Sequence, residues 1–499
     1  MNKLDNLFTK VMNTMLKIIL SIIIIASICI LFPILIDSNV GTIVFLLVII
    51  ISILFEYKII NSNISYKQKI FSLILISIFI KILWILNADN TPNSDFKVMY
   101  ECGKNFIAGD LSCFKGIGYI GRFPHLTIHV LYMAAIQYLS PANNLLIMKI
   151  ISLFLGTTVV LIVYLITLEL FKSKEKALLS LLIASVFPPF ITYTSVFCSE
   201  NLAMPFYLLS IYLFLRGIES DKYKFRLFCL SSICLAFGNL FRMVAIIILI
   251  AYTLYILIYY KDRIFKKLIN IVFVTVPYFL IIVLVSSILQ KANITENPLW
   301  RGSEPKITNV LKGTNFNSLG MWNVEDAKLV EENINNYDEL KLKCKEVIHD
   351  RFTTASTIKV LIFYLGKLGS QWCIGDFAGS LWTQKDVPKE KIIFKIGIFS
   401  SAPFQIFYII ILIFIFLGLK KRSVMNSNSK LNLFYLIFLG YIAAYLITEN
   451  QNRYGYIISW LFIILAVDGI KVDFYLKQKM NRFIIYLKTI TFSIILEIK

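Results

Sequence analysis

Long apolar runs separated by short polar turns dominate the pattern of this chain. Twelve such runs occur, and most approach the roughly 20 residues that a helix needs to cross the hydrocarbon layer of a bilayer. The pattern therefore predicts an all-α, polytopic membrane protein with about twelve transmembrane helices. The runs lie at 17–36, 40–57, 69–87, 145–171, 177–197, 203–217, 227–241, 243–260, 268–288, 398–418, 431–448 and 454–470.

A further apolar stretch, 124–140, is assigned by charge rather than by hydropathy. Basic residues gather in the cytoplasmic loops of membrane proteins. If 124–140 stays out of the bilayer, every basic cluster shares the side of the N-terminus, whereas if it spans, every cluster after the first changes side. We therefore expect 124–140 to lie along the outer surface as a juxtamembrane helix. The clusters are Lys58/Lys67/Lys69, Lys172/Lys174/Lys176, Arg216/Lys222/Lys224/Arg226, Lys261/Arg263/Lys266/Lys267, Lys420/Lys421/Arg422 and Lys471/Lys477/Lys479.

Two long segments, 88–144 and 290–397, then face outward. The larger segment mixes charges of both signs with Gly, Asn and Trp, and its stretch 325–350 has apolar residues at helical spacing. It is predicted to form a small extracytoplasmic domain that caps the membrane helices. The apolar residues of this stretch are Leu329, Ile334, Leu340 and Val347.

The chain is thus predicted to have three parts: an N-terminal transmembrane catalytic module at 1–289, the cap domain at 290–397, and C-terminal transmembrane helices at 398–499. The first apolar run follows basic residues and shows no small-residue cleavage pattern, so we expect it to remain as an anchor. At the other end, 481–499 fits either an amphipathic surface helix or a last span.

Composition supports the membrane assignment. Of the 499 residues, 58% are hydrophobic and 16% are charged, with a mean hydropathy of +0.74, which excludes an ordinary soluble domain. The net charge of +20 does not indicate nucleic-acid binding, because the basic residues form short clusters between apolar runs. The eight cysteines show no CxxC spacing, which argues against a redox or zinc module. On an oxidising outer side, Cys102 with Cys113 or Cys344 with Cys373 are candidate disulfides.

The first outer segment opens with a predicted amphipathic helix at 95–108. Pro92 and Ser94 supply its start, and Gly109 supplies its end. Asp95 falls in the first turn, beside the bilayer, where the helix dipole alone would stabilise a carboxylate. The residues expected on the membrane face of this helix are Phe96, Met99, Gly103 and Phe106.

A second acid, Glu200, occupies a comparable place, where one spanning run ends on the outer face and the next begins. Either acid has a plain alternative role as a cap residue. Two acids at one membrane edge, with few other charges nearby, also suit a site that handles protons or a metal ion. The pair therefore marks a candidate site on the outer face.

Cationic residues are scarce in the short outer turns, which singles out Arg242 and Arg453. Each can be an interfacial anchor. Alternatively, each can hold two phosphate oxygens with its planar fork and neutralise a leaving group. Arg122, His125 and His129 form a third group, and the four-residue spacing of the histidines permits a metal pair or ordinary packing.

The order of these features resembles the membrane-embedded GT-C glycosyltransferases, in particular family 39, which contains bacterial relatives of protein O-mannosyltransferases and aminoarabinose transferases. The resemblance covers most of the chain. It is carried by PNSDFKVMY at 92–100, RFPHLTIHVLYMAAIQYL at 122–139, SENLAMPFYLL at 199–209, FRMVAIIILIA at 241–251, KGTNFNSLGMWNVEDA at 312–327 and ENQNRYGYIISWLFIILA at 449–466.

The resemblance implies transfer of a sugar from a polyprenyl-phosphate donor, undecaprenyl phosphate in a bacterium, to an acceptor outside the cytoplasm. It implies that Asp95 is the catalytic base and that Glu200 corresponds to a second acidic residue of the family's active site. This sequence departs from the family pattern in two ways. Two additional spans precede the segment that contains Asp95, and Glu200 stands where many relatives have Asp. The remaining candidates are Arg242, Arg453 and Arg122 for the donor phosphate, and Lys97, Tyr100, His125 and Tyr454 for other substrate contacts.

The leading hypothesis is therefore an inverting glycosyltransferase in the plasma or inner membrane, with its active site on the extracytoplasmic face. The acceptor is a protein, a lipid or a cell-envelope polymer, and nucleic acid is not a partner. No cofactor is assigned, and the use of a divalent metal is left open. The main alternative is a transporter or flippase of lipid-linked sugars, and a second alternative is a polymerase or ligase that uses a polyprenyl diphosphate.

Overall fold

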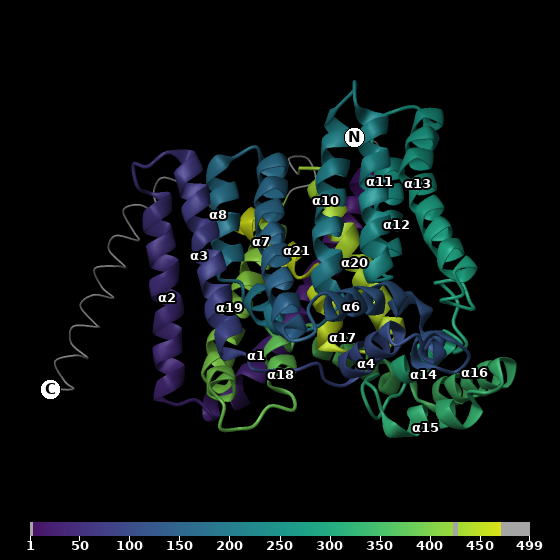
Figure 1. Ribbon diagram of the computed structural model, residues 1–499. Helices are drawn as coiled ribbons and strands as arrows, with labels where there is room; N and C mark the ends of the chain where they lie inside the picture. Colours follow the sequence, from purple (N-terminus) through teal and green to yellow (C-terminus); the bar gives the residue numbers. More distant parts are fainter. Residues whose placement is uncertain (1–2, 423–427, 471–499) are drawn as a thin grey trace.

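The computed structural model describes residues 3–422 and 428–470, and these contain helices and no strand (Figure 1). Eight of the helices are long and apolar enough to cross a membrane. They are α1 (Lys3–Ile36), α2 (Val40–Ile60), α3 (Tyr66–Asn87), α7 (Asn144–Phe171), α10 (Glu200–Glu219), α11 (Lys224–Phe241), α13 (Ile264–Lys291) and α19 (Ile392–Lys421). The chain is therefore a multi-pass membrane protein.

A ninth candidate span is broken. Helix α8 (Lys174–Ser185) is followed by α9 (Pro188–Thr192) and the 3-10 turn η3 (Tyr193–Ser195), with a bend of 55° between them. The bend falls at two consecutive prolines, Pro188 and Pro189, which lack the backbone N–H that a continuous helix requires. After the break, Tyr193 of η3 stacks on Tyr456, with ring centroids 3.6 Å apart.

The three remaining predicted runs fall on shorter apolar helices. These are α12 (Ile246–Ile258), α20 (Leu431–Ile447) and α21 (Trp460–Gly469). Each of the twelve predicted runs thus coincides with apolar helical structure, but only eight or nine elements have the length of a membrane span. The last run is divided because the 3-10 segment η4 (Asn452–Ile458) takes up its first residues. The prediction of about twelve crossings therefore exceeds the count that helix length supports.

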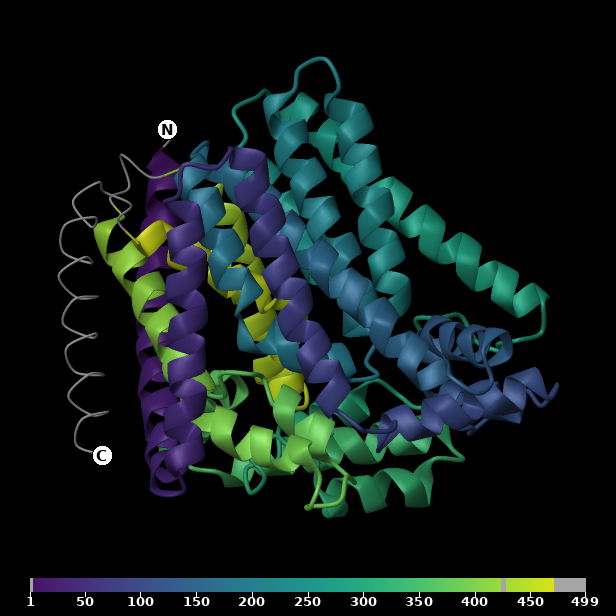
Figure 2. The same cartoon turned by 60° about the vertical axis from the view of Figure 1, so that its left-hand side comes forward.

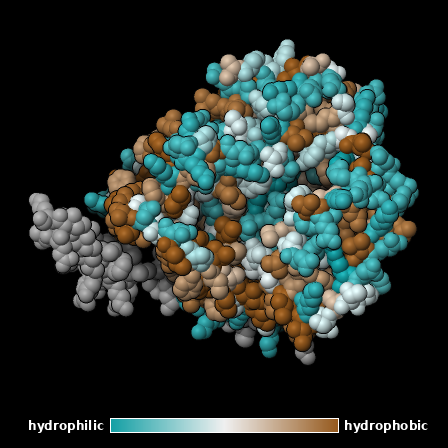
Figure 3. Space-filling view, turned by 90° about the horizontal axis from the view of Figure 1, so that it is seen from below, coloured by the Kyte–Doolittle hydropathy of each residue, from teal (hydrophilic) through white to brown (hydrophobic). Residues whose placement is uncertain are grey.

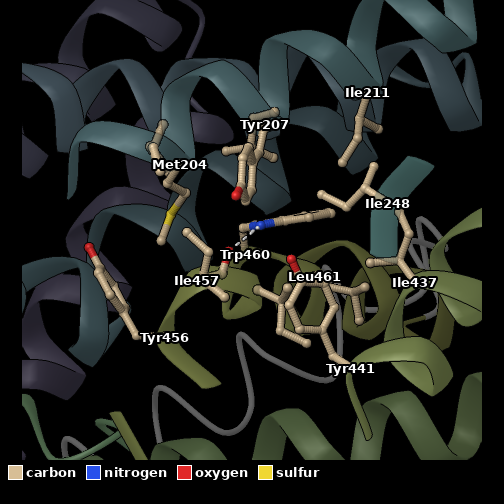
Figure 4. Close-up of a cluster of buried hydrophobic side chains, with 14 of the residues drawn as sticks. Met204, Tyr207, Ile211, Ile248, Ile437, Tyr441, Tyr456, Ile457, Trp460 and Leu461 are labelled. Carbon is tan, nitrogen blue, oxygen red and sulfur yellow. Dashed lines mark hydrogen bonds between the residues drawn. The ribbon is translucent and has the colours of Figure 1, made fainter. Parts of the chain in front are cut away.

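The central core surrounds α21. No residue of α21 from Trp460 to Val467 is exposed to solvent. This burial is expected, because these residues make the helix apolar on all sides. Figure 4 shows Trp460 packed among Tyr207 of α10, Ile248 of α12 and Tyr441 of α20. The indole Nε1 of Trp460 donates a hydrogen bond to the carbonyl of Ile457 at 3.0 Å. This core fixes η4, which lies directly before α21.

The first outer segment forms the predicted juxtamembrane helices. Helix α4 (Asp95–Ile107) and helix α6 (Thr127–Leu139) pack on each other, and Figure 1 shows both lying across the direction of the long helices. Short elements connect them, namely η1 (Ser112–Phe114), α5 (Tyr119–Arg122) and η2 (Pro124–Leu126). Helix α6 has 13 residues and is not a candidate span, in agreement with the expected surface position of 124–140.

Helix α4 buries the predicted face through Phe96, Met99 and Gly103, and it ends before Gly109, whose φ is +84°. The predicted cap at Ser94 is wrong in one respect. Ser94 is the residue before the helix, as predicted, but its φ is +50° and its side chain makes no capping hydrogen bond. The segment is instead held by a disulfide between Cys102 and Cys113, whose Cα atoms are 5.9 Å apart.

The second outer segment contains a small core of its own. Helices α14 (Ile307–Gly313), α15 (Val324–Asn333) and α16 (Tyr337–Thr354) enclose Leu311, Val330, Ile334, Leu340 and Cys344. The stretch predicted as one helical region is two helices, because Asn336 starts α16 by accepting a hydrogen bond from the backbone N–H of Glu339. The alternative pair Cys344 and Cys373 is not bonded.

The rest of that segment packs on the membrane helices. Helix α17 (Thr357–Trp372) contacts α1 and α20, and α18 (Gly379–Gln384) contacts α19 and α9. The boundaries at 289 and 397 stay a prediction. The C-terminal stretch 481–499 and the basic cluster at 471–479 lie outside the described residues.

The two ends of the bundle differ in the way that the charge pattern predicts. In Figures 1 and 2 the N-terminus and the turns that join α2 to α3, α7 to α8, α10 to α11 and α12 to α13 lie at one end. Helices α4, α6, α14, α15, α16 and α18 lie at the other end. The basic clusters among the described residues belong to the first end, so these helices gather opposite to them.

Candidate active site

The candidate site is built from the starts and ends of helices at the outer end of the bundle. Asp95 is the first residue of α4, and its side chain is 47% exposed. Its Oδ2 lies 3.7 Å from Nη2 of Arg453, which is carried by η4 and is 6% exposed. The structure therefore brings together an accessible carboxylate and a buried guanidinium from distant parts of the sequence.

Three aromatic rings hold the guanidinium of Arg453 in place. Its Cζ lies 4.8 Å from the ring centroid of Phe96, 4.5 Å from that of Trp382 and 5.5 Å from that of Tyr454. Such rings stabilise a cation through their negative faces. Nε and Nη1 of Arg453 are buried and have no hydrogen-bond partner among the described residues. These donors are available to an anionic ligand.

A second ion pair lies beside the first. Glu200 begins α10, is 2% exposed, and has its Oε1 3.4 Å from Nε of Arg242, the residue that follows α11. The guanidinium of Arg242 also lies over the ring of Tyr454, 5.2 Å from its centroid. Since Tyr454 contacts both guanidinium groups, the two ion pairs form one continuous cluster.

The turn that carries Arg242 is shaped by its neighbours. The carbonyl of Arg242 accepts a hydrogen bond from the Tyr207 hydroxyl, and the side-chain oxygen of Asn239 accepts the backbone N–H of Ala245 at 3.2 Å. On the facing segment, burial and then the negative charge of Glu449 raise the pKa of Tyr454 to about 12. Tyr454 is therefore an uncharged hydrogen-bonding group at neutral pH.

The histidines line the same region as neutral groups. Burial, followed by the positive charges of Arg242 and Lys306, lowers the pKa of His125 to about 3. Burial also lowers the pKa of His129 to about 4. His129 Nε2 lies 3.3 Å from the carbonyl oxygen of Phe197, and its Nδ1 has no hydrogen-bond partner in the part of the chain that the structure describes. Within residues 3–422 and 428–470, no group of three or more His, Cys, Asp or Glu side chains could hold a metal ion.

Three predicted residues are placed elsewhere. Both edges of the Arg122 guanidinium are engaged, by Glu304 at 2.7 Å and Glu331 at 2.8 Å, so this residue fastens the cap to the first outer segment. The Tyr100 hydroxyl donates to Asn144 Oδ1 at 2.8 Å and thereby ties α4 to α7. Lys97 is exposed on α4. The contacts of these three residues do not connect them to the ion-pair cluster.

Several residues of the site lie outside every motif considered in the sequence. Trp382 of α18 stacks on Arg453, and its carbonyl accepts a hydrogen bond from Asn93 Nδ2 at 3.2 Å, two residues before Asp95. Tyr119 is also coupled to this carboxylate: burial, and then the negative charge of Asp95, raise the pKa of the Tyr119 phenol. The sequence signal for both is weak, since each is an isolated aromatic residue in an outer segment.

A buried lysine, Lys149, supports the segment that leads to Asp95. Its Nζ donates to the carbonyl of Ala88 at 2.7 Å and to that of Asn90 at 3.1 Å. The start of α4 is thereby anchored to α7. Figure 3 looks onto the outer end and shows hydrophilic residues spread over it, with a hollow near its middle.

Comparison with known proteins identifies a family that matches part of the chain. Residues 127–288 match the model of a family described as dolichyl-phosphate-mannose-protein mannosyltransferase. No curated protein matches the chain. The matched range includes α6, Glu200 and Arg242, and therefore half of the ion-pair cluster.

The candidate spans and the family match indicate a membrane glycosyltransferase with several transmembrane helices that uses a lipid-linked, polyprenyl-phosphate-type sugar donor. Residues 127–288 are therefore similar to the dolichyl-phosphate-mannose-protein mannosyltransferase family, of the GT-C type, in agreement with the resemblance seen in the sequence. The matched family implies a lipid-phosphate sugar donor and an acceptor as partners.

Proposed function

We propose that this protein is an inverting glycosyltransferase that moves a sugar from a polyprenyl phosphate to a hydroxyl acceptor outside the cytoplasm. The observation that carries the proposal is the 3.7 Å separation between the Asp95 carboxylate and the Arg453 guanidinium. One group takes up a proton and the other stabilises an anion, and a transfer of this kind needs both functions side by side.

In the proposed reaction, Asp95 removes the proton from the acceptor hydroxyl as its oxygen attacks the anomeric carbon. The bond between that carbon and the phosphate oxygen breaks, and polyprenyl phosphate leaves with the electron pair. Attack from the side opposite to the phosphate inverts the configuration at the anomeric carbon. The exposed position of Asp95 suits contact with an acceptor that arrives from the aqueous side.

Arg453 and Arg242 are proposed to bind the phosphate. Arg453 retains two buried nitrogen donors without partners, and its stacked rings hold the fork in one orientation. The Arg242 guanidinium also lies over Tyr454, with its Cζ 5.2 Å from the ring centroid. Glu200 pairs with Arg242 at 3.4 Å, so its proposed role is to orient this cation. This scheme assigns no chemical role to the other candidates, namely Arg122, His125, Lys97 and Tyr100.

The proposal places the site on the extracytoplasmic face. Its support is the segregation of basic turns at the opposite end of the bundle. The predicted topology of about twelve crossings then requires the short helices α12, α20 and α21, and the bent pair α8 and α9, to cross together with their longer neighbours. A protein, lipid or cell-envelope polymer remains the proposed range of acceptors.

The test uses purified protein in sealed liposomes that contain a labelled, monophosphate-linked polyprenyl sugar. We expect the label to leave the lipid, with free polyprenyl phosphate as the second product, and the transferred sugar to have the inverted anomeric configuration by NMR. Movement of intact donor across the bilayer without bond cleavage would instead support the transporter alternative. Retained anomeric configuration would contradict direct displacement.

A further inference from the structure

A pocket lies between the segment before α14 and the start of α16, apart from the ion-pair cluster. It has a volume of about 350 Å³ and is lined by Trp300, Arg301, Lys306, Tyr337 and Lys341, among others. This volume falls within the range of small-molecule sites, roughly 300–1,000 Å³. The pocket shares no residue with the ion-pair cluster that contains Asp95.

The lining combines positive charge with exposed aromatic surface. Arg301, Lys306 and Lys341 are all exposed, and no salt bridge is observed for them in the described part of the chain. The lining includes no acidic residue. Trp300 is 41% exposed, and the guanidinium of Arg301 lies 5.6 Å from the ring centroid of Tyr337.

Each part of this combination recognises a particular chemical group. Uncompensated cations bind carboxylates and phosphates. Aromatic rings with one apolar face and one polar edge pack on ligands that are themselves partly apolar and partly polar, as a sugar ring is. A ligand that carries acidic groups on a chain of sugar rings matches both features at once.

The pocket is fixed to the loop that leads into the candidate active site. The backbone N–H of Ser303 donates to the carbonyl of Gly121 at 3.1 Å, and its hydroxyl donates to the carbonyl of Gly116 at 2.7 Å. Gly302 lies so close to the carbonyl of Arg122 that a Cβ atom there would overlap it. The chain beside the pocket, at Gly302 and Ser303, is therefore packed directly against the first outer segment.

His125 lies between the pocket and the ion-pair cluster in the electrostatic sense, because charged groups of both act on it. The positive charges of Lys306, on the pocket wall, and Arg242, in the ion-pair cluster, both lower the pKa of His125. His125 thus lies within electrostatic range of both. A ligand seated in the pocket is on the same side of the molecule as the catalytic cluster.

We propose that this pocket binds the acceptor and that the acceptor is an anionic glycan. Its acidic groups contact Arg301, Lys306 and Lys341, while its sugar rings pack against Trp300 and Tyr337. The inference rests on the proposed function, because it names the acceptor class of that reaction. An acidic peptide would use the three cations but would leave the two aromatic faces without a matching sugar ring.

The experiment measures binding of a fluorescent oligogalacturonate to the full-length protein in nanodiscs. Its fully methyl-esterified form is the neutral comparison, and poly-glutamate of similar charge is the peptide comparison. We expect the acidic oligosaccharide to bind at least about tenfold more tightly than either of the other ligands. Equal binding of the esterified form, or tighter binding of poly-glutamate, would overturn the proposal.

Two double variants locate the binding. Arg301→Gln with Lys341→Gln removes two pocket cations, whereas Lys328→Gln with Lys389→Gln removes the same charge at exposed positions elsewhere. We expect about tenfold weaker binding in the first variant and little change in the second. Trp300→Ala should also weaken binding of the glycan but not of poly-glutamate. Equal loss in both double variants would show general charge attraction and overturn the site.

Cleavage of the labelled donor lipid is measured in the same preparations. Normal cleavage together with lost glycan binding in the pocket variant supports the proposal. Normal cleavage with unchanged glycan binding refutes the pocket but leaves the proposed function standing. Absence of donor cleavage in the wild-type protein refutes the proposed function itself, whatever the glycan measurement shows.

Discussion

Oε1 of Glu200 lies 3.4 Å from Nε of Arg242, and this pair joins the start of α10 to the end of α11 at the polar end of the bundle. Glu200 is 2% exposed, so the two charges depend on each other for compensation. Removing one partner of a buried pair leaves an uncompensated charge, and this usually costs about 3–5 kcal/mol.

A double-mutant cycle tests this dependence. We expect Glu200→Gln and Arg242→Gln each to lower the melting temperature and the affinity for donor lipid, and the double variant to lose less than the sum. The coupling energy should be about 1–3 kcal/mol, as for residues in direct contact. Additive effects would show that the two residues act independently and would contradict the role of Glu200 in orienting Arg242.

Replacement of Lys367 should destabilise the protein, although nothing in the sequence around Lys367 marks it as important. Its buried Nζ donates to the carbonyls of Leu446 at 2.9 Å and Thr448 at 2.7 Å, and also to that of Gly313. It therefore clamps the cap to the segment that leads from α20 to Arg453. We expect Lys367→Met to lower the melting temperature and the transfer rate, because buried unpaired carbonyls each cost about 1–3 kcal/mol.

Lys359→Met is the matched control for this prediction. Lys359 is exposed on the same helix, α17, so its replacement removes an equal charge without disturbing the clamp. Thermal unfolding followed by intrinsic fluorescence measures both variants. If the two variants unfold at the same temperature, the three carbonyl contacts do not stabilise the fold.

The contrast between these residues shows what the sequence could predict. Asp95 was recognisable because it begins an amphipathic helix, and the charge pattern placed this helix at the outer end. Lys367 and Trp382 could not be recognised, because their importance arises from carbonyls and a guanidinium brought to them by the fold. Arg122 was misleading for the same reason, since its partner Glu304 lies in another segment.

The number of spans had a similar limit. Hydropathy identified every apolar helix, but it could not show that η4 divides the last run or that two prolines bend α8 from α9. These interruptions have a structural consequence, because η4 carries Arg453 and the bent segment precedes Glu200. The irregular backbone lies where the candidate site requires side chains to converge.

Acidic pH should destabilise the protein through His129. Burial, partly offset by the Phe197 carbonyl, lowers its pKa from 6.5 to about 4. Between these values the unfolded chain binds a proton at His129 that the folded protein does not. The stability contributed by neutral His129 is therefore fully present above pH 6.5 and is lost as the pH falls toward 4. With about 1.4 kcal/mol for each pKa unit, the loss is on the order of 3 kcal/mol.

The measurement is the melting temperature as a function of pH, for the wild-type protein and for His129→Gln. Glutamine can still donate a hydrogen bond to the carbonyl but does not titrate in this range. We expect a shallower decline between pH 6.5 and 4 in the variant. Identical pH profiles would mean that other groups cause the decline.

The disulfide between Cys102 and Cys113 offers a test of sidedness. A stable disulfide requires an oxidising environment, so α4 and the loop after it should face away from the cytoplasm. In intact cells we expect a membrane-impermeant maleimide to label these cysteines only after treatment with an impermeant reductant. Cys102→Ala with Cys113→Ala is the control. Labelling without reductant would contradict the bond, and labelling only after cell lysis would place α4 on the cytoplasmic side.

The account depends most on Asp95 as the base of the reaction. Asp95→Asn keeps the size of the side chain while removing its ability to take up a proton. The measurement is the initial rate of sugar transfer from a labelled polyprenyl phosphate, in preparations with equal amounts of folded protein and equal donor binding. A positioned general base contributes about 10²–10⁴-fold, so we predict a rate at least about 100-fold below that of the wild-type protein. A rate close to that of the wild-type protein would contradict the central claim.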